Sequence, residues 1–272
     1  MTLAELVRLA LQEDLGPGDL TSAATVGSET LGVARIRAKQ DLILSGTEPA
    51  AEAFRQRGVG CKALASDGEA VHDGQAVLTL EGPLRGLLEA ERVALNFLMR
   101  LSGIATHTAA VVAVAGQLRV VDTRKTTPLL RTLEKAAVRH GGGGNHRFGL
   151  FDGVLIKENH IIGAGGVAAA IHAARATAHH LLRIQIEVES LAQLQEAMDA
   201  GADAVLLDNM TDDELRAAVR VANGRVITEA SGNLDGPRIA RLADSGLDQV
   251  SVGGLIHQAR WADLSLRVDQ AL

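Results

Sequence analysis

The sequence predicts an α/β protein, with a small N-terminal α+β part followed by a larger barrel of parallel strands. Residues 31–82 contain short strand-like runs, broken by glycines and by one helical segment. Beyond Leu118, short apolar runs without polar alternation are separated by Ala-rich helical segments, the pattern of parallel strands buried on both faces. The chain of 272 residues, 47% of them hydrophobic, is long enough for one large domain or two modest ones.

The first fifteen residues predict an amphipathic helix, not a signal peptide. The apolar positions of its one face are Leu3, Leu6, Val7, Ala10 and Leu11. No apolar run in the chain approaches the ~18 residues that a membrane span needs. The single cysteine, Cys61, excludes an internal disulfide framework, which is typical of a reducing compartment. We therefore expect a cytoplasmic protein.

A continuous helical period over residues 84–116 predicts a helix that links the two parts. We expect an N-terminal domain over residues 1–110, which includes this helix, and a barrel domain with the active site over residues 111–255. Residues 256–272 form a C-terminal segment that we expect to return to the N-terminal domain.

Six short apolar runs follow the linking helix, and nearly every run ends in a polar residue or glycine. In barrels of parallel strands, reactive groups gather at the carboxyl ends of the strands and on the loops that follow. The sequence therefore brings polar residues that are far apart in the chain to one mouth, namely Arg124, Lys125, Lys157, Glu187, Asp208 and Ser231.

The segment from Arg119 to His160 is a cationic island in an acidic protein. It holds eight Lys or Arg against four acids, a local charge of +4 in a chain of net charge -6. Aromatic residues make up only 2%, which argues against a nucleic-acid surface. A pocket for a compact polyanion fits better, because Arg grips carboxylates and phosphates with paired hydrogen bonds and Lys offers a point charge. The alternative, a solvated and salt-bridged helix face, fits only the residues at helical spacing: Arg131, Glu134, Lys135 and Arg139.

The two carboxylates of the predicted mouth leave two interpretations open. Glu187 and Asp208 are hard oxygen ligands that suit Mg²⁺ held through water beside a substrate phosphate, or they pair with Lys157 or Lys125. The loops 230–233 and 252–254 predict a site for a 5′-phosphate, with simple tight turns as the alternative. The run Gly141–Gly144 is interpreted as a flexible turn that lets His146 and Arg147 approach a ligand.

Seven motifs in order make the match to a known family specific. They are DTRKTTP (122–128), GGGGNHR (141–147), LIKENH (155–160), EVES (187–190), LLDNM (206–210), EASGN (229–233) and SVGG (251–254). The chain resembles the quinolinate phosphoribosyltransferases, also called carboxylating nicotinate-nucleotide pyrophosphorylases, nearly from end to end. The resemblance implies the type II phosphoribosyltransferase fold, with an N-terminal α/β sandwich and an open seven-stranded α/β barrel. It also implies homodimers in which each active site borrows groups from the partner subunit.

The same resemblance implies that quinolinate and phosphoribosyl pyrophosphate give nicotinate mononucleotide, pyrophosphate and carbon dioxide, in the de novo synthesis of NAD. The quinolinate carboxylates would be held by Arg124, His146 and Arg147, with Arg92 contributed across the dimer interface. Lys125 and Lys157 would serve the carboxylate and phosphoribosyl pyrophosphate anions, and Glu187 and Asp208 the ribose and Mg²⁺. The 5′-phosphate would be bound by the two late loops: Ser231, Gly232, Asn233, Gly253 and Gly254. The expected catalytic set is Lys125, Lys157, Glu187 and Asp208.

The chain departs from the family pattern in three places. Leu129 and Asn233 stand where glycine is expected, and the tail after SVGG differs from the usual pattern. The alternatives are a molybdenum-transport accessory protein of the same fold, a salvage enzyme that takes nicotinate, and a ligand sensor without catalysis. The intact LIKENH segment and the full set of charged residues argue against them.

Overall fold

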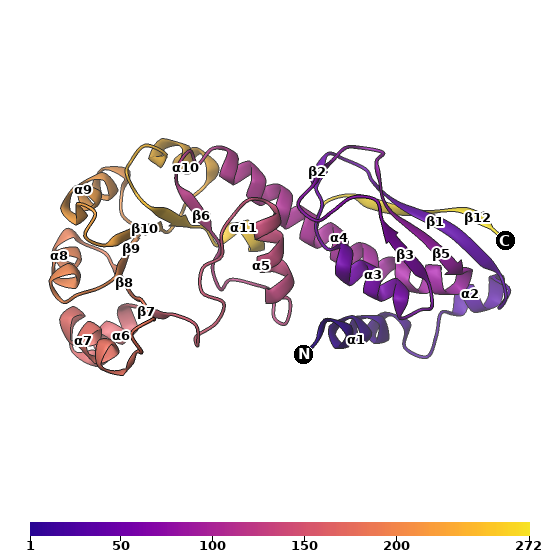
Figure 1. Cartoon of the computed structure of the whole chain (residues 1–272), viewed down its shortest axis with the longest axis horizontal. Coiled ribbons are helices and arrows are strands. Elements are labelled where there is room, and N and C mark those ends of the chain that lie inside the picture. Colours follow the sequence, from indigo (N-terminus) through magenta and orange to yellow (C-terminus); the bar gives the residue numbers. More distant parts are fainter. The chain divides into compact units, whose positions relative to one another are not determined.

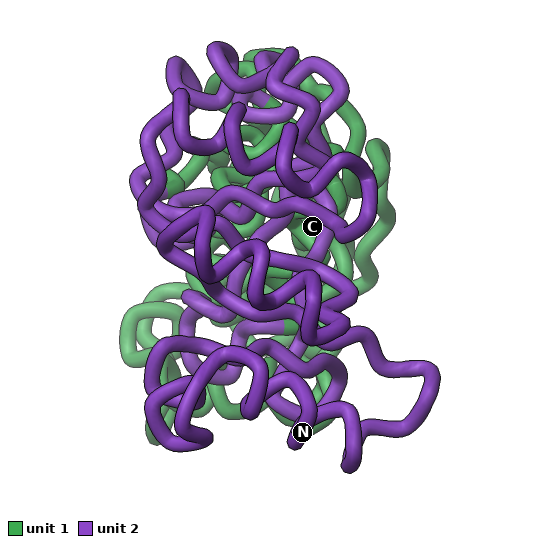
Figure 2. The backbone as a smooth tube through the Cα atoms, turned by 90° about the vertical axis from the view of Figure 1, so that its left-hand side faces the viewer, with its two compact units in different colours: residues 1–109, 132–142, 259–272 green, residues 110–131, 143–258 purple.

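The computed structural model describes residues 1–272, which form two compact units built from discontinuous segments. Unit 1 comprises residues 1–109, 132–142 and 259–272, and unit 2 comprises residues 110–131 and 143–258 (Figure 2). Residues 132–142 therefore belong to unit 1, whereas the sequence had placed them in the barrel domain. These residues lie between two of the predicted strands in the sequence, but their contacts are with unit 1.

Unit 1 is built around a four-stranded antiparallel sheet with the order β12-β1-β5-β3 (Figure 1). The strands are β1 (Leu31–Ala38), β3 (Gly60–Ala63), β5 (Ala76–Pro83) and β12 (Leu264–Ala271). A separate pair is formed by β2 (Leu42–Ile43) and β4 (Ala70–Val71). The C-terminal strand β12 pairs with β1 from Gly32↔Ala271 to Ala38↔Leu264, so the C-terminal segment joins the sheet of the N-terminal part of the chain.

The helices of unit 1 are α1 (Leu3–Leu15), α2 (Leu20–Thr25), α3 (Thr47–Arg55), α4 (Leu84–Ala113) and α5 (Arg131–His140), with the ends of α4 and α5 crossing the unit boundary. Helix α1 begins at a capping box, in which the side chain of Thr2 accepts from the backbone of Glu5 and the Glu5 carboxylate accepts from the backbone of Thr2. None of the helices is long and apolar enough to cross a membrane.

Helix α5 is not the solvated helix face that its charge spacing suggests. Glu134 is fully buried and pairs with Arg100 at 2.8 Å, and Lys135 is only 2% exposed. A buried carboxylate needs a partner such as Arg100, because its desolvation is costly. The interpretation of these charges as a solvent-exposed network is therefore wrong for Glu134 and Lys135.

Unit 2 contains a six-stranded parallel sheet with the order β6-β11-β10-β9-β8-β7. Its strands are β6 (Arg119–Val121), β7 (Val154–Ile156), β8 (Ile184–Val188), β9 (Ala204–Asp208), β10 (Ile227–Ser231) and β11 (Gln249–Ser251). They are the six predicted apolar runs. The helices are α6 (Glu158–Ala164), α7 (Val167–Thr177), α8 (Leu191–Asp199), α9 (Asp212–Ala222), α10 (Gly236–Leu242) and α11 (Gly254–His257). Figure 1 shows α7, α8 and α9 on the outside of an arc of strands.

A seventh strand position is marked in unit 2 by a single parallel bridge between Val121 and Gly144. The amide of Gly144 donates to the carbonyl of Val120 at 2.7 Å, and the amide of Asp122 donates to the carbonyl of Gly144 at 3.1 Å. Gly144 thus extends the sheet beyond β6, and a Cβ there would lie 3.1 Å from Val121 Cγ1 and 2.9 Å from Arg119 Nε. The expected turn is present at Gly141 and Gly142, whereas Gly144 is held by the sheet.

Candidate active site

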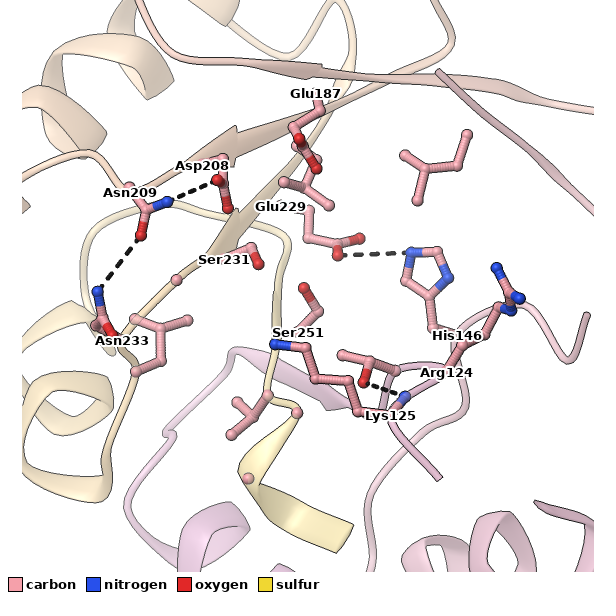
Figure 3. A pocket seen from close by; sticks show the side chains of 18 of the residues that line it. Arg124, Lys125, His146, Glu187, Asp208, Asn209, Glu229, Ser231, Asn233 and Ser251 are labelled. Atoms are coloured by element: carbon pink, nitrogen blue, oxygen red, sulfur yellow. Dashed lines mark hydrogen bonds and ion pairs between the residues drawn. The ribbon is translucent and has the colours of Figure 1, made fainter. Parts of the chain in front are cut away.

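A pocket of about 740 Å³ opens at the carboxyl ends of the parallel strands of unit 2. It is lined by twelve of the predicted site residues: Arg124, Lys125, His146, Arg147, Lys157, Glu187, Asp208, Ser231, Gly232, Asn233, Gly253 and Gly254. The remaining one, Arg92, is exposed on α4 in unit 1 and does not line this pocket. Figure 3 shows how side chains from separate strands converge on the pocket.

The register of the sheet explains why these particular residues meet. Glu187 is in register with Leu206, and Leu206 is in register with Glu229. Two residues further along, Asp208 is in register with Ser231. Because side chains alternate along a strand, both levels project to the same face of the sheet. The pocket is therefore built from alternate residues of strands β8, β9 and β10.

The carboxylates of the pocket are held by specific partners. Lys157 Nζ forms an ion pair with Glu187 Oε2, and Asn209 Nδ2 donates to Asp208 Oδ2 at 2.7 Å. Lys157 itself is fixed at the start of α6, where its backbone amide donates to His160 Nδ1 at 3.0 Å. Burial and the nearby charge of Glu187 raise the pKa of Asp208, although Lys157 and hydrogen bonds from Ser231 and Asn209 oppose the rise.

The pairing of Glu187 with Lys157 is one of the two interpretations that the sequence left open. No group of three or more His, Cys, Asp or Glu residues in the chain is arranged to hold a metal ion. Two neighbouring carboxylates, one of them with a raised pKa, fit a hard divalent cation whose other ligands come from water and substrate oxygens. They do not form a closed protein site for a metal.

Two guanidinium groups lie close enough to repel one another in the cationic part of the pocket. Burial and the charge of Arg124 lower the pKa of Arg147, and Asp152 partly offsets this effect. Arg147 Nη1 donates to the carbonyl of Gly153 at 3.0 Å, which orients the guanidinium. A bound anion would relieve the repulsion and take up the remaining N–H groups. The arrangement suits a ligand with closely spaced negative charges.

The loop after β10 is bound to the end of β9. The amide of Asn209 donates to the carbonyl of Ser231 at 3.1 Å, and Asn233 Nδ2 donates to Asn209 Oδ1 at 3.4 Å. Gly232 has φ +93°, and a Cβ there would lie 2.3 Å from Asn209 Oδ1. Glycine at position 232 is therefore required both by the backbone conformation and by the close approach of Asn209.

Lys125 lies against the second late loop. A Cβ on Gly253 would come within 2.8 Å of Lys125 Cδ and 3.5 Å of its Nζ, so the missing side chain leaves room for the ammonium group. The backbone of Lys125 is fixed by its amide, which donates to Thr123 Oγ1 at 3.0 Å. The loop thereby places a cation beside backbone that can bind an anion.

Sequence reasoning missed several lining residues. They include Thr123, Asn209, Glu229, Ser251, His257 and Gln258. The alternation of inward-facing residues along β10 and β11 gave a signal for Glu229 and Ser251, since each lies two residues from another lining position. His257 is the last residue of the short helix α11 and Gln258 is its C-cap, and no periodicity in the sequence marks them.

Comparisons with known proteins find a likeness over almost the whole chain. Residues 19–102 match the model of the quinolinate phosphoribosyl transferase N-terminal domain, and residues 104–267 match that of the C-terminal domain. The chain is 40% identical to the probable nicotinate-nucleotide pyrophosphorylase (carboxylating) of Bacillus subtilis, over 98% of this chain and 94% of the relative.

Solved structures extend the likeness to the fold. NadC from Streptococcus pyogenes is 39% identical with a TM-score of 0.94, covering 98% of this chain and 97% of that one. The nicotinate-nucleotide pyrophosphorylase from Francisella tularensis is 39% identical with a TM-score of 0.93, covering 98% and 96%. These structures confirm the expected sandwich and open barrel. The chain belongs to the quinolinate phosphoribosyl transferase family.

Proposed function

We propose that the chain transfers the phosphoribosyl group of phosphoribosyl pyrophosphate to quinolinate with loss of carbon dioxide. The products are nicotinate mononucleotide, pyrophosphate and carbon dioxide, in the de novo synthesis of NAD. The observation that carries the proposal is the pocket itself, in which the cations of one side face two carboxylates, Glu187 and Asp208, on strand ends of the same sheet. Membership of the family supplies the substrate class.

The arrangement of charges suits each bond that breaks. When the bond from the anomeric carbon to pyrophosphate breaks, its electrons leave with pyrophosphate and positive charge develops on the sugar. Glu187 and Asp208 stabilise that charge, while Lys125 and Lys157 stabilise the leaving group. The lone pair of the ring nitrogen then forms the new bond to carbon.

The pyridinium nitrogen formed in this way is positively charged, so it stabilises the electron pair that decarboxylation leaves on the ring. The carboxylate next to it leaves as carbon dioxide, its bonding electrons stay on the ring carbon beside the cationic nitrogen, and a proton from water completes the product. Arg124 and Arg147 hold the carboxylates in place, so that positioning and electrostatics supply most of the rate.

The test is a direct assay of carbon dioxide release and nicotinate mononucleotide formation, with quinolinate and nicotinate in parallel reactions. We expect turnover of quinolinate alone, because two guanidinium groups, Arg124 and Arg147, line the pocket and can serve more than one carboxylate. Turnover of nicotinate alone would favour a salvage enzyme. Binding without any turnover by folded protein would favour the accessory or sensor function instead.

We also propose that Mg²⁺ acts with this site, held by Glu187 and Asp208 through water or through the substrate. When bound it would neutralise charge on the pyrophosphate group. The support is the pair of carboxylates without a third protein ligand. Chelation with EDTA should therefore abolish turnover and leave the melting temperature of the substrate-free protein unchanged. A large drop in that melting temperature would contradict a metal that arrives with the substrate.

We further propose a homodimer in which Arg92 of one subunit completes the active site of the other. Two features support it: Arg92 is exposed but does not line the pocket of its own chain, and apolar side chains lie exposed just after Arg147. These are Phe148, Leu150 and Phe151, which are 37%, 70% and 80% exposed. Exposed apolar side chains gathered in one loop are typical of interaction surfaces.

A cytoplasmic location is proposed from the single cysteine, whose thiol has a pKa raised to about 11 by burial. Such a thiol is a poor nucleophile and has no second cysteine with which to form a disulfide within the chain. Fractionation that recovers the protein outside the cytoplasm would contradict this proposal.

A further inference from the structure

Among the residues that line the pocket, Glu229 is a carboxylate that the proposed reaction does not use. It lies near the end of β10 and is 0% exposed, and its Oε1 has no hydrogen-bond partner. Burial alone would raise the pKa of Glu229, but the polar side chains around it, His146 first and then Ser251 and Gln185, lower it below its usual range. A buried carboxylate costs free energy unless something compensates, so an apolar residue would serve packing better.

We propose that Glu229 is a positioning residue that fixes the substrate ligand Arg147 through a relay formed by Gln185 and the ring of His146. The inference rests on the proposed function in one respect, namely that Arg147 holds a carboxylate of quinolinate. The relay itself is a chain of hydrogen bonds, and its directions follow from the chemistry of its members.

A carboxylate can only accept hydrogen bonds, and this fixes the first step. Gln185 Nε2 donates to Glu229 Oε2 at 2.9 Å, so the amide oxygen of Gln185 must face the other way. That oxygen lies 3.1 Å from His146 Nε2. Because an amide oxygen only accepts, Nε2 of His146 carries the proton. Glu229 Oε1 lies 3.6 Å from the same nitrogen and favours the same protonation (Figure 3).

The second ring nitrogen of His146 completes the relay. With the proton on Nε2, Nδ1 of the neutral ring is an acceptor, and the backbone amide of Arg147 donates to it at 2.8 Å. The negative charge of Glu229 thus acts through Gln185 and His146, and it determines the contact that anchors the backbone of Arg147.

The same segment is also held by a second buried carboxylate, Asp122. Asp122 is 0% exposed, and it accepts from the amide of His146 at 2.9 Å and from Asn145 Nδ2 at 2.7 Å. Two carboxylates therefore fix the short segment that ends in Arg147. Placement errors of about 1 Å in such a ligand are costly to binding and rate, which gives two buried carboxylates a function here.

The experiment uses Glu229→Gln, which keeps the shape of the side chain but adds an N–H donor. To accept the hydrogen bonds from Gln185 Nε2 and Gln249 Nε2, the new amide oxygen must face these two residues. The new NH₂ group then faces the Nε2–H of His146. We expect KM for quinolinate to rise about tenfold, kcat to change less than about threefold, and KM for phosphoribosyl pyrophosphate to stay unchanged. The ¹⁵N spectrum of the His146 ring in the substrate-free protein should show loss of the Nε2–H tautomer.

The matched control is Gln249→Leu. Gln249 also donates to Glu229 Oε2 and is not a member of the relay, so the control removes a bond to the carboxylate and leaves the bonds of Gln185 and His146 in place. We expect its His146 spectrum and its KM for quinolinate to match the wild type. Equal changes in both variants would show that Glu229 serves packing only, and would overturn the proposal.

A second variant, Gln185→Leu, breaks the relay in the middle and leaves the carboxylate in place. It should reproduce the quinolinate effect of Glu229→Gln, and it decides the matter if the first variant fails to fold. Wild-type values of KM for quinolinate and of the His146 spectrum in either variant would overturn the relay. The spectrum is recorded without substrate, so a wild-type protein that fails to turn over quinolinate would refute the proposed function while leaving this test of the relay intact.

Discussion

At the scale of single residues, the ionised carboxylate of Asp208 lowers the stability of the folded protein, although the proposed reaction needs its charge. The folded protein binds the proton of this carboxyl more tightly than the unfolded chain does, because burial and Glu187 raise its pKa. The ionised form therefore lowers stability above the raised pKa, and this loss disappears as pH falls toward the ordinary value of 3.8.

Replacement Asp208→Asn should consequently raise the melting temperature by a few degrees at neutral pH, and the difference should vanish near pH 3.5. Turnover should fall on the order of a hundredfold or more, since a charge that stabilises the developing cation is lost. Thermal unfolding between pH 3.5 and 8, with assays of the same samples, tests both statements. A variant less stable than wild type at neutral pH would contradict the sign.

Leu129 and Asn233 are two positions at which the family resemblance pointed to an unusual backbone conformation. Both stand where glycine was expected, and both have positive φ, +67° and +50°. Asparagine tolerates this region, whereas leucine pays about 1–2 kcal/mol for it. The glycines of the family pattern thus indicated positive φ at both positions, which the residue types in this sequence do not indicate by themselves.

Leu129→Gly should therefore stabilise the protein by about 0.5 kcal/mol, the relief of strain less the entropy that glycine adds to the unfolded chain. Leu129 is 73% exposed, so little packing is lost. The control is Leu181→Gly, in which a 77% exposed leucine without positive φ is replaced. Denaturant unfolding should rank Leu129→Gly above wild type and Leu181→Gly below it; the reverse order would refute the strain at position 129.

At the scale of elements, periodicity predicted all six parallel strands and the mouth at which they end. Buried parallel strands are continuous apolar runs, so their carboxyl ends could be recognised from composition. The seventh position escaped because a single bridge at Gly144 has no apolar run. The buried charges of α5 escaped because spacing shows which residues share a helix face and not what covers that face.

The close contact between the loops after β9 and β10 predicts a graded response to alanine. Gly232→Ala meets both strain at φ +93° and Asn209 Oδ1 at 2.3 Å, whereas Gly224→Ala meets strain at φ +70° with open space around it. We expect a loss of about 1 kcal/mol for Gly224→Ala and about 2–4 kcal/mol for Gly232→Ala.

Only Gly232→Ala should also raise KM for phosphoribosyl pyrophosphate, by about tenfold, because it displaces the loop proposed to bind the 5′-phosphate. Denaturant unfolding and steady-state kinetics on both variants measure the two effects separately. Similar KM values for the two variants would show that the loop does not contact this substrate.

At the scale of the whole molecule, the site residues expected from the sequence are not all found in the pocket of a single chain. Twelve of the predicted site residues line the pocket, and Arg92 does not. A pocket is fixed by strands that follow one another in sequence, which makes it predictable from periodicity. Arg92, which we propose is supplied by a partner subunit, has no such signal within the chain, and its assignment rests on the resemblance alone.

Mixed dimers decide whether sites are shared. Arg92→Ala and Lys157→Ala should each be nearly inactive, because each removes a cation from every site of a symmetric dimer. In a hybrid of the two, the barrel of the first variant keeps Lys157 and receives Arg92 from the second, so one of its two sites is intact. After unfolding and refolding an equal mixture, random pairing should restore about a quarter of wild-type turnover.

The control is a mixture of Lys157→Ala with Arg147→Ala. Both changes lie in the same pocket of one chain, so no pairing of subunits yields an intact site and activity should stay near zero. Recovery in the first mixture and not in the second would establish a site built from two chains. No recovery in the first mixture, with dimers present by sedimentation, would mean that Arg92 acts within its own subunit or not at all, and the shared site would have to be abandoned.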